Sequence, residues 1–285
     1  MHDCRVAGLG NLTQAFNKLA PQYSLNVMDL PWSRADLVAA VEKILDKQNE
    51  GHQTDAESLV QPNITVDGRV APSVETWALD SCVIDVNAQA VAVRVIKTQA
   101  ISLTRTCQYQ EIIFAWFAHG QLSCLKTLRD NDARRAEQEL EKATPQNLQA
   151  PCHTSLDLEA KYRAYIKSIN DQTMEATFDG FCKAWVSHNA AKKTIAEYIS
   201  LIQESQSAIQ GLNFEIQDLI IDKDAGRVAA RLEFTGTPVK RWADAMPTGG
   251  SVKFHEHVMY WFDEGKIHWV WSIVDLDTYR EQLQS

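Results

Sequence analysis

The 285-residue chain contains no hydrophobic run near the roughly 20 residues that a membrane-spanning helix requires. Its six cysteines are scattered and form no C-x-x-C pair, which argues against a disulfide framework and favours a reduced, cytoplasmic setting. The N-terminal residues show no basic region followed by an apolar core, so we expect no signal peptide.

The motifs of several common enzyme classes are also missing. The sequence has no G-x-S-x-G nucleophile elbow, no phosphate-binding glycine loop and no dinucleotide fingerprint. It has no long basic run, and the formal charge of −9 disfavours nucleic acid or an anionic membrane as a partner. What remains is an ordinary globular composition, with 45% hydrophobic and 23% charged residues.

Two stretches of the sequence repeat one another. VIDVNAQAVAVRV (Val83–Val95) matches IIDKDAGRVAARL (Ile220–Leu232) at an offset of 137 residues. Further along, Gln108–Asp132 aligns without a gap with Lys253–Asp277 at an offset of 145 residues. Two blocks in the same order indicate an internal duplication, and the length of 285 residues agrees with two domains.

We place the domain boundary in a polar, proline-containing stretch, TPQNLQAPCHTS (Thr144–Ser155), so that the domains are residues 1–150 and 151–285. In the second domain helical apolar stripes come first and four alternating strands follow, which is an α+β pattern. A strongly twisted antiparallel sheet that curls round its helices forms a cone with an apolar mouth. Such a cavity suits a small, largely apolar ligand.

The expected elements follow from hydrophobic periodicity. The first domain is expected to contain a helix capped by Ser33, strands at Trp77–Asp85, Ala90–Thr98, Gln108–Phe117 and Gln121–Leu128, and a helix at Asp132–Lys142. The second is expected to contain helices along Leu158–Ile169, Met174–Trp185 and Thr194–Ile209, strands at Phe214–Ile221, Arg227–Thr235, Ser251–Phe262 and Lys266–Asp275, and a last helical turn at Thr278–Leu283.

Three blocks of the second domain carry a resemblance to a known family. They are GRVAARLEFTGT (Gly226–Thr237), MPTGGSVKFHEHVMYWFDEGKI (Met246–Ile267) and a terminal W-x-x-x-D (Trp271–Asp275). In this order they resemble the SnoaL-like polyketide cyclases of the nuclear-transport-factor-2-like superfamily, over residues 156–283. The resemblance implies a cystatin-like α+β cone and an activity without cofactor or metal.

The first domain resembles the family only through its likeness to the second. It lacks the proline-threonine-glycine loop and most of the third helix, so we interpret it as a degenerate, non-catalytic copy. Family members often pair through their sheets, and the resemblance therefore implies two cones arranged as an internal pseudo-dimer. A further homodimer of whole chains is an open alternative.

Asp275 ends the last expected strand, on the same face as Trp269, Trp271 and Ile273. If that face lines the cone, desolvation among the rings would raise the pKa of Asp275 and suit it to proton transfer near neutrality. In related cyclases an aspartate at this place is the general acid/base, so the resemblance implies a catalytic role for Asp275 beside two binding tryptophans. The alternative is a surface aspartate that caps the terminal helix before Thr278.

Glu256 shares a strand face with Val258 and Tyr260, where a glutamate is unexpected if the face packs on a core. It either points into the cavity as a second catalytic carboxylate or makes a structural hydrogen bond. Many family members have a histidine where this chain has Val258, so the usual histidine–aspartate pair is missing. His255 and His257 fall on the opposite face, where we expect sheet-interface residues and no metal site.

Further candidates surround the expected cavity mouth. His188 and Asn189 match the family's H-N-G-type turn and could hydrogen-bond a ligand carbonyl and its developing oxyanion, or could simply form a turn. Tyr162 and Tyr165 could donate phenol protons into the cavity or only pack in the core. Trp242 could cover the mouth or only shield its rim.

The sequence therefore predicts a cofactor-independent acid/base enzyme that cyclises, isomerises or dehydrates a polyketide- or terpenoid-like small molecule of secondary metabolism. The alternative is a non-catalytic small-molecule-binding or scaffolding protein of the same superfamily. An open apolar cavity that holds Asp275 or Glu256 would support the enzyme. A cavity filled by Trp269, Trp271 and Tyr260 would support the binding protein.

Overall fold

A computed structural model of the chain describes residues 31–54, 64–66, 69–71, 75–102, 104–148 and 155–284. These residues divide into two compact units. The first contains the described residues up to Thr127 together with Ala133–Ala143, and the second contains Leu128–Asp132 and the described residues from Thr144 onward. Among the described helices, none is long and apolar enough to cross a membrane.

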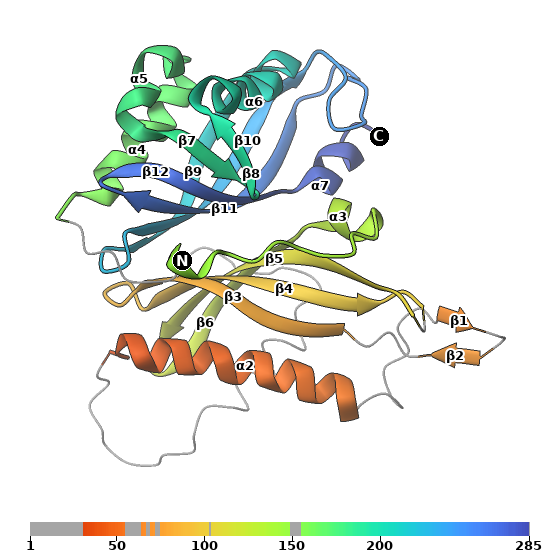
Figure 1. The fold of residues 1–285 in the computed structure, drawn as a ribbon. Coiled ribbons are helices and arrows are strands. Elements are labelled where there is room, and N and C mark those ends of the chain that lie inside the picture. The colour runs from red at the N-terminus through yellow and green to blue at the C-terminus, as the bar shows by residue number, and fades with distance from the viewer. Residues whose placement is uncertain are drawn as a thin grey trace. The chain divides into compact units, whose positions relative to one another are not determined.

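The first unit consists of one long helix on a four-stranded antiparallel sheet with strand order β3-β4-β5-β6 (Figure 1). Its elements are α2 (Arg34–Thr54), the hairpin β1 (Ile64–Val66) and β2 (Arg69–Ala71), β3 (Glu75–Asp85), β4 (Ala90–Ala100), β5 (Thr106–Ala118) and most of β6 (Gln121–Arg129). The end of β6 and the start of the short α3 (Asn131–Arg135) are assigned to the second unit. Ser33 begins α2 as expected, because the backbone N–H of Asp36 donates to Ser33 Oγ at 3.3 Å. Leu37, Val41 and Leu45 then pack on one face of the sheet.

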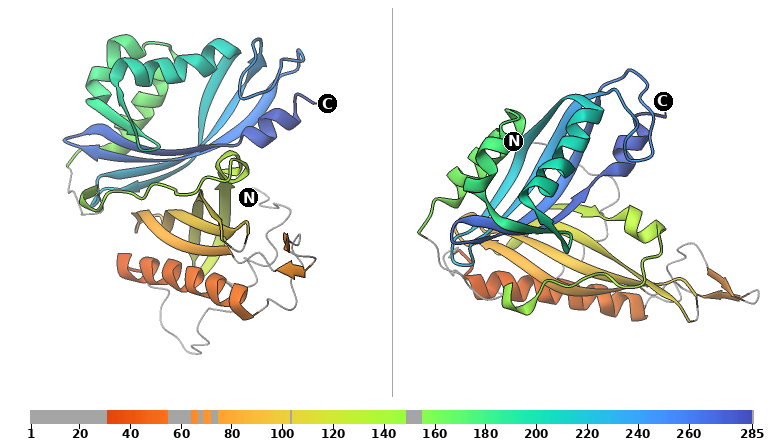
Figure 2. Two further views of the ribbon diagram at one scale, coloured as in Figure 1. Left: turned by 45° about the vertical axis from the view of Figure 1, so that its right-hand side comes forward. Right: turned by 45° about the horizontal axis from the view of Figure 1, so that its top comes forward.

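The second unit is a curved six-stranded sheet with strand order β8-β7-β12-β11-β10-β9. Its helices lie on one face of that sheet (Figures 1 and 2). The elements are the short 3-10 turn Gln146–Leu148, α4 (Leu158–Asn170), α5 (Met174–Phe181), β7 (Cys182–His188), β8 (Ala191–Thr194), α6 (Ile195–Ala208), β9 (Ile209–Asp222), β10 (Arg227–Pro238), β11 (Val252–Asp263), β12 (Lys266–Val274) and α7 (Leu276–Glu281). This helix-then-strand order confirms the predicted α+β class.

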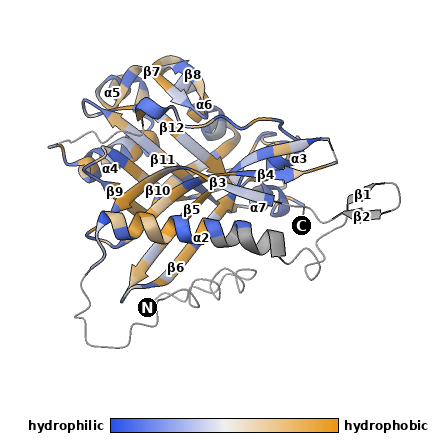
Figure 3. Cartoon of the chain, turned by 60° about the horizontal axis from the view of Figure 1, so that its bottom comes forward, coloured by the Kyte–Doolittle hydropathy of each residue, from blue (hydrophilic) through white to orange (hydrophobic). Residues whose placement is uncertain are grey.

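Local capping and alternation explain how the second unit is built. Thr194 starts α6 with a capping box, in which its side chain accepts from the N–H of Glu197 and the Glu197 carboxylate accepts from the N–H of Thr194. On β11, Phe254, Val258 and Tyr260 alternate toward the helices and join the buried core. Figure 3 shows hydrophobic residues concentrated on the central strands of this sheet.

The other face of the same sheet is buried as well. Trp271 Nε1 donates to Thr144 Oγ1 at 2.7 Å, and Trp261 Nε1 donates to the Leu148 carbonyl at 3.1 Å. Met259, between these tryptophans, has no exposed surface. The described start of the expected linker, Thr144–Leu148, therefore belongs to the second unit and is hydrogen-bonded to its sheet. The rest of that linker, up to 154, lies outside the described residues.

Two predicted helices are longer than the observed ones. The helix at Asp132–Lys142 is wrong beyond Arg135, because Glu137 adopts a positive φ of 51° that an α-helix does not accommodate. The stripe Met174–Trp185 is helical only to Phe181, since the following residues pair with β12 as strand β7. Trp185 is consequently 50% exposed on this strand.

The two units share a strand register. Adding 137 to each residue number of β4 and 145 to each residue number of β5 converts the β4–β5 residue pairs into the β10–β11 pairs. For example, Val95 lies opposite Glu111, and the corresponding Leu232 lies opposite Glu256. The ladders β3–β4 and β9–β10 also carry a β-bulge at corresponding places. Bulges are specific local features rather than random irregularities. The shared register therefore supports the prediction of an internal duplication.

Candidate active site

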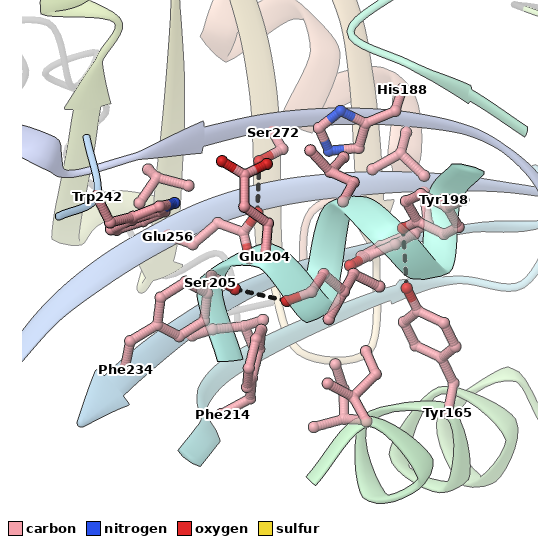
Figure 4. A pocket seen from close by; sticks show the side chains of 18 residues that line it. Tyr165, His188, Tyr198, Glu204, Ser205, Phe214, Phe234, Trp242, Glu256 and Ser272 are labelled. Atoms are coloured by element: carbon pink, nitrogen blue, oxygen red, sulfur yellow. Dashed lines mark hydrogen bonds between the residues drawn. The ribbon is translucent and has the colours of Figure 1, made fainter. Parts of the chain in front are cut away.

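A cavity of about 160 Å³ lies in the second unit between the helices and the inner sheet face (Figure 4). Its wall is mainly apolar and aromatic, and the rings are contributed by Tyr165, Tyr198, Phe214, Phe234, Trp242 and Tyr260. An apolar cavity of about 150 Å³ in another protein is large enough to bind benzene. The space seen here therefore accepts about one aromatic ring, and larger ligands must extend through the mouth.

Glu256 is one of two described glutamates that line this cavity, and it is the one that the sheet supplies. Strand β11 directs it to the same face as Val258 and Tyr260, and part of its surface stays accessible through the cavity. Burial raises the pKa of Glu256 to about 7, although the hydrogen bond that Ser272 Oγ donates to Glu256 Oε1 acts in the opposite direction. A carboxyl group with a pKa near 7 can both take and return a proton at neutral pH.

Asn189 fixes the backbone of Ser272. Asn189 Nδ2 donates to the Ser272 carbonyl at 2.9 Å, and the Ser272 N–H donates to Asn189 Oδ1 at 2.8 Å. Asn189 can reach this position because β7 runs parallel to β12 and its own N–H donates to the carbonyl of Val270. The turn thus positions the serine that hydrogen-bonds Glu256.

His188, the last residue of β7, lines the same cavity. Burial, with a smaller contribution from the positive charge of Lys193, lowers the pKa of His188 to about 4. The imidazole is therefore neutral at pH 7. Its ring has no hydrogen-bond partner among the described residues, so one N–H is available to donate to a ligand oxygen.

Two phenols next to His188 form a pair. Tyr165 and Tyr198 share a hydrogen bond of 2.8 Å between their hydroxyl oxygens, and the ring of Tyr198 lies 5.8 Å from that of His188, centroid to centroid. Burial raises the pKa of both tyrosines, so both phenols stay protonated at neutral pH. The cavity thus places neutral hydrogen-bond donors in the same lining as the titratable carboxyl of Glu256.

Comparison with known proteins identifies the family of the second unit. Residues 159–283 match the sequence model of the SnoaL-like polyketide cyclases. A SnoaL-like polyketide cyclase of Agrobacterium tumefaciens is 34% identical over 45% of this chain and 98% of its own length, with a TM-score of 0.42. The chain belongs to the SnoaL-like polyketide cyclase family. No functionally curated protein matches it.

More distant solved structures also match the SnoaL-like domain. TsrD from Streptomyces laurentii is 18% identical, over 45% of this chain and 98% of its own, with a TM-score of 0.41. IdmH from Streptomyces antibioticus is 18% identical, over 46% of this chain and 100% of its own, with a TM-score of 0.41.

The structure brings together only part of the predicted site. In the SnoaL-like domain Tyr165, Trp242 and Tyr260 line the cavity with Glu256 and His188, as expected for binding residues. Tyr162 is fully buried behind them, with its ring centroid 5.1 Å from that of Tyr260. Two further predicted binding residues, Val258 and Asn189, are not in the lining: Val258 is core, and Asn189 bonds to the backbone of Ser272.

The expected position of Asp275 inside the cavity is wrong. Asp275 is the N-cap of α7, where its carboxylate accepts from the N–H of Thr278 at 3.1 Å and from Thr278 Oγ1 at 2.7 Å. Trp269 and Trp271 are likewise absent from the lining. Trp271 is paired with Met259, whose face of the sheet is opposite to that of Glu256. The prediction that Trp269 and Trp271 share one strand face is correct, but that face is the one opposite to the cavity.

His255 and His257 lie on the face away from the cavity, as expected. His257 is buried there, and His255 Nε2 is 3.3 Å from Glu233 Oε2. Within the described parts of the chain, no group of three or more His, Cys, Asp and Glu side chains is arranged to hold a metal ion.

Several cavity residues were not anticipated, among them Ser272, Tyr198, Phe214, Phe234 and Glu204. The sequence does not single out Ser272, because Lys266 and His268 alternate with it along β12 as Val270 and Val274 do. The irregular pairing of β11 and β12 between Trp261 and Phe262, which only the structure shows, changes this alternation. The helical residues Tyr198 and Glu204 gave no signal either, because their spacing fits an ordinary amphipathic helix.

Replacing Ser272 with alanine should change the pH dependence of any reaction at Glu256. The serine donates to the carboxylate and so favours the ionised form, and its loss should raise the midpoint of the pH–rate profile by about 1 pH unit. The matched control is Ser207→Ala, an exposed serine on α6 outside the lining. An S272A profile with the wild-type midpoint would show that this hydrogen bond does not tune Glu256.

Proposed function

We propose that this protein is a cofactor-independent acid/base enzyme that acts on a polyketide- or terpenoid-like small molecule carrying an acidic C–H beside a carbonyl group. One observation supports this above all: an open apolar cavity holds the carboxyl group of Glu256, whose pKa is raised to about 7. A binding protein has no need of a titratable group that is held in an apolar cavity at a cost in stability. Membership of the SnoaL-like polyketide cyclase family points in the same direction.

The residues of the cavity suffice for an enolisation. The Glu256 carboxylate removes the proton from the carbon, that C–H bond breaks, and its electron pair moves into the enolate. The neutral imidazole of His188 donates a hydrogen bond to the enolate oxygen, where negative charge develops. The phenols of Tyr165 and Tyr198 lie beside His188, and because both stay protonated they add no charge to this part of the cavity.

Three outcomes then follow from one intermediate. The enolate carbon can attack a second carbonyl of the same molecule, which forms a C–C bond and closes a ring, with the Glu256 proton passing to the new alkoxide. Alternatively, the enolate takes the proton back from Glu256 at a different carbon, which isomerises the substrate. In the third outcome the enolate expels a β-hydroxyl group, which receives the proton from Glu256 and leaves as water. Each outcome balances without any other reactant.

A proton-exchange experiment tests the proposal without knowledge of the natural substrate. A panel of aromatic ketones with one to three rings is incubated with the protein in D₂O, and loss of the C–H signal beside the carbonyl is followed by NMR. We expect at least one ketone to exchange faster with the wild type than with E256Q. Equal rates throughout the panel would favour the non-catalytic binding protein.

We further propose that the chain is a tandem pair of nuclear-transport-factor-2-like domains, the first being the degenerate, non-catalytic copy. The strand register shared by the two units supports this proposal. That the two sheets pair as a pseudo-dimer stays a prediction, which cross-linking between the units would test. The cytoplasmic setting and a further homodimer also stay predictions.

A further inference from the structure

Ionisable side chains that line the cavity can carry negative charge, and no lysine or arginine of the described lining balances it. The carboxyl groups among them are those of Glu256 and Glu204. His188 is neutral, and Lys193, the cation that influences it, is not part of the lining. A ligand with a carboxylate or phosphate would therefore meet negative charge and no compensating cation.

Glu204 stands out on α6. It is exposed, and its carboxylate makes no hydrogen bond or ion pair with another described residue, unlike Glu159, which pairs with Arg163. It also lies in the C-terminal part of the helix Ile195–Ala208, where a negative charge opposes the helix dipole. Neither helix stability nor a salt bridge explains this carboxylate, yet it lines the cavity.

Aromatic faces accompany Glu204 at this side of the cavity. Trp242, Phe214 and Phe234 line the same space, and the rings of Phe214 and Phe234 are 4.4 Å apart, centroid to centroid (Figure 4). Aromatic rings attract cations through the negative potential of their faces, and a nearby carboxylate adds to this attraction. The combination is suited to a positively charged nitrogen.

We propose that the ligand of this cavity is a ring-bearing molecule with a basic nitrogen, and that Glu204 binds its cation at the rim. The proposal deepens the proposed function, on which it rests for the identification of the site. A cation held by Glu204 leaves the carboxyl of Glu256 free for proton transfer to and from the ring system. Glu204 is then the residue that determines specificity, and Glu256 the one that performs the chemistry.

Three probes that share a phenyl ring and differ in charge test the proposal by isothermal titration calorimetry at pH 7. They are 2-phenylethylamine, 2-phenylethanol and 3-phenylpropionate. We expect the amine to bind about fivefold to tenfold more tightly than the alcohol, which is the range for a partly desolvated ion pair with cation–π contacts. The carboxylate should bind most weakly.

Variants assign this preference to one side chain. E204Q should bring the amine to the affinity of the alcohol while leaving the alcohol unchanged, and E204K should favour the carboxylate. The matched control, Glu215→Lys, makes the same charge change at an exposed position of β9 outside the lining and should keep the wild-type order. Equal binding of amine and carboxylate, no binding of any probe, or an unchanged preference in E204Q would overturn the proposal.

Failure here and failure of the acid/base function are distinguishable. The calorimetric test measures binding without turnover, so the amine preference can be absent while ketone exchange at Glu256 persists. Conversely, E256Q should lose exchange and keep the order of the three probes, because the rim carboxylate is untouched.

Discussion

Replacing Glu256 with glutamine is expected to lower kcat by about 10³-fold, which is within the range that a positioned general acid/base contributes. Glutamine keeps the shape of the side chain and can still accept from Ser272 Oγ, but it cannot take a proton. The measurement is the rate of solvent exchange or turnover with the best ketone of the panel. The matched control is Asp275→Asn, which retains a good helix cap and should keep the wild-type rate.

The same substitution should stabilise the protein, and only at high pH. The pKa of Glu256 is raised from an ordinary 4.5 to about 7, so folding costs free energy once the folded-state carboxyl is ionised. This cost is absent below pH 4.5, grows between pH 4.5 and 7, and is complete above pH 7, where it amounts to about 3 kcal/mol. E256Q should therefore have a higher Tm than the wild type at pH 8 and the same Tm at pH 4. A loss of activity together with a lower Tm at pH 8 would instead indicate a structural role.

Replacing Lys97 with methionine is expected to destabilise the first unit by about 3–5 kcal/mol, the usual cost of breaking a buried ion pair. The Lys97 side chain has no exposed surface and its Nζ contacts the carboxylates of Glu111 and Glu75, the latter at 3.2 Å. The same Nζ lies 3.5 Å from the ring centroid of Trp77. Without the lysine, two largely buried carboxylates lose their cation. Chemical denaturation followed by circular dichroism measures the effect.

Two further variants make this prediction specific. Arg105→Met, which removes an exposed partner of Glu137 in the same unit, should cost less than about 1 kcal/mol. The double variant K97M/E111Q should recover much of the loss, because it also removes the buried negative charge that Lys97 compensates. If K97M were as mild as the Arg105 variant, the buried pair would not be a structural element of the first unit.

Lys97 also explains in physical terms why the first unit is expected to be non-catalytic. At the offset of 137 residues its counterpart is Phe234, a ring of the cavity wall, and at the offset of 145 residues the counterpart of Glu111 is Glu256. In the first unit the lysine occupies the place of the phenylalanine and pairs with the glutamate. A carboxylate held by a cation in this way is not available as a free base.

The sequence was sufficient for the strands but not for the face that each one presents. Alternation placed Glu256, Val258 and Tyr260 together correctly, and it also grouped Trp269 with Trp271. Since cross-strand neighbours share a face, only one of the two groups can point into the cavity, and the register between β11 and β12 decides which. The two tryptophans suggested a binding pocket, whereas the indole N–H of Trp271 donates to Thr144 outside the cavity and the ring of Trp269 packs against that of Trp271.

Other parts of the site depend on contacts between distant residues. Asn189 was recognised by its turn motif, but its hydrogen bonds to Ser272 arise only because β7 and β12 become parallel neighbours. Strand β7 itself was predicted as the end of a helix, since Phe178, Phe181 and Trp185 fit a helical stripe. Sheet hydrogen bonds outweigh this weak local preference.

The pKa of Glu256 in the folded protein decides whether this residue can be the acid/base of the site. Selective ¹³C labelling of glutamate side chains, with E256Q to assign the resonance, allows the carboxyl to be titrated by NMR between pH 3 and 9. We expect a midpoint near 7, because the group is desolvated inside the cavity. A midpoint near 4.5, the ordinary value for glutamate, would mean that Glu256 is almost fully ionised at neutral pH and would contradict its role as the acid/base of this site.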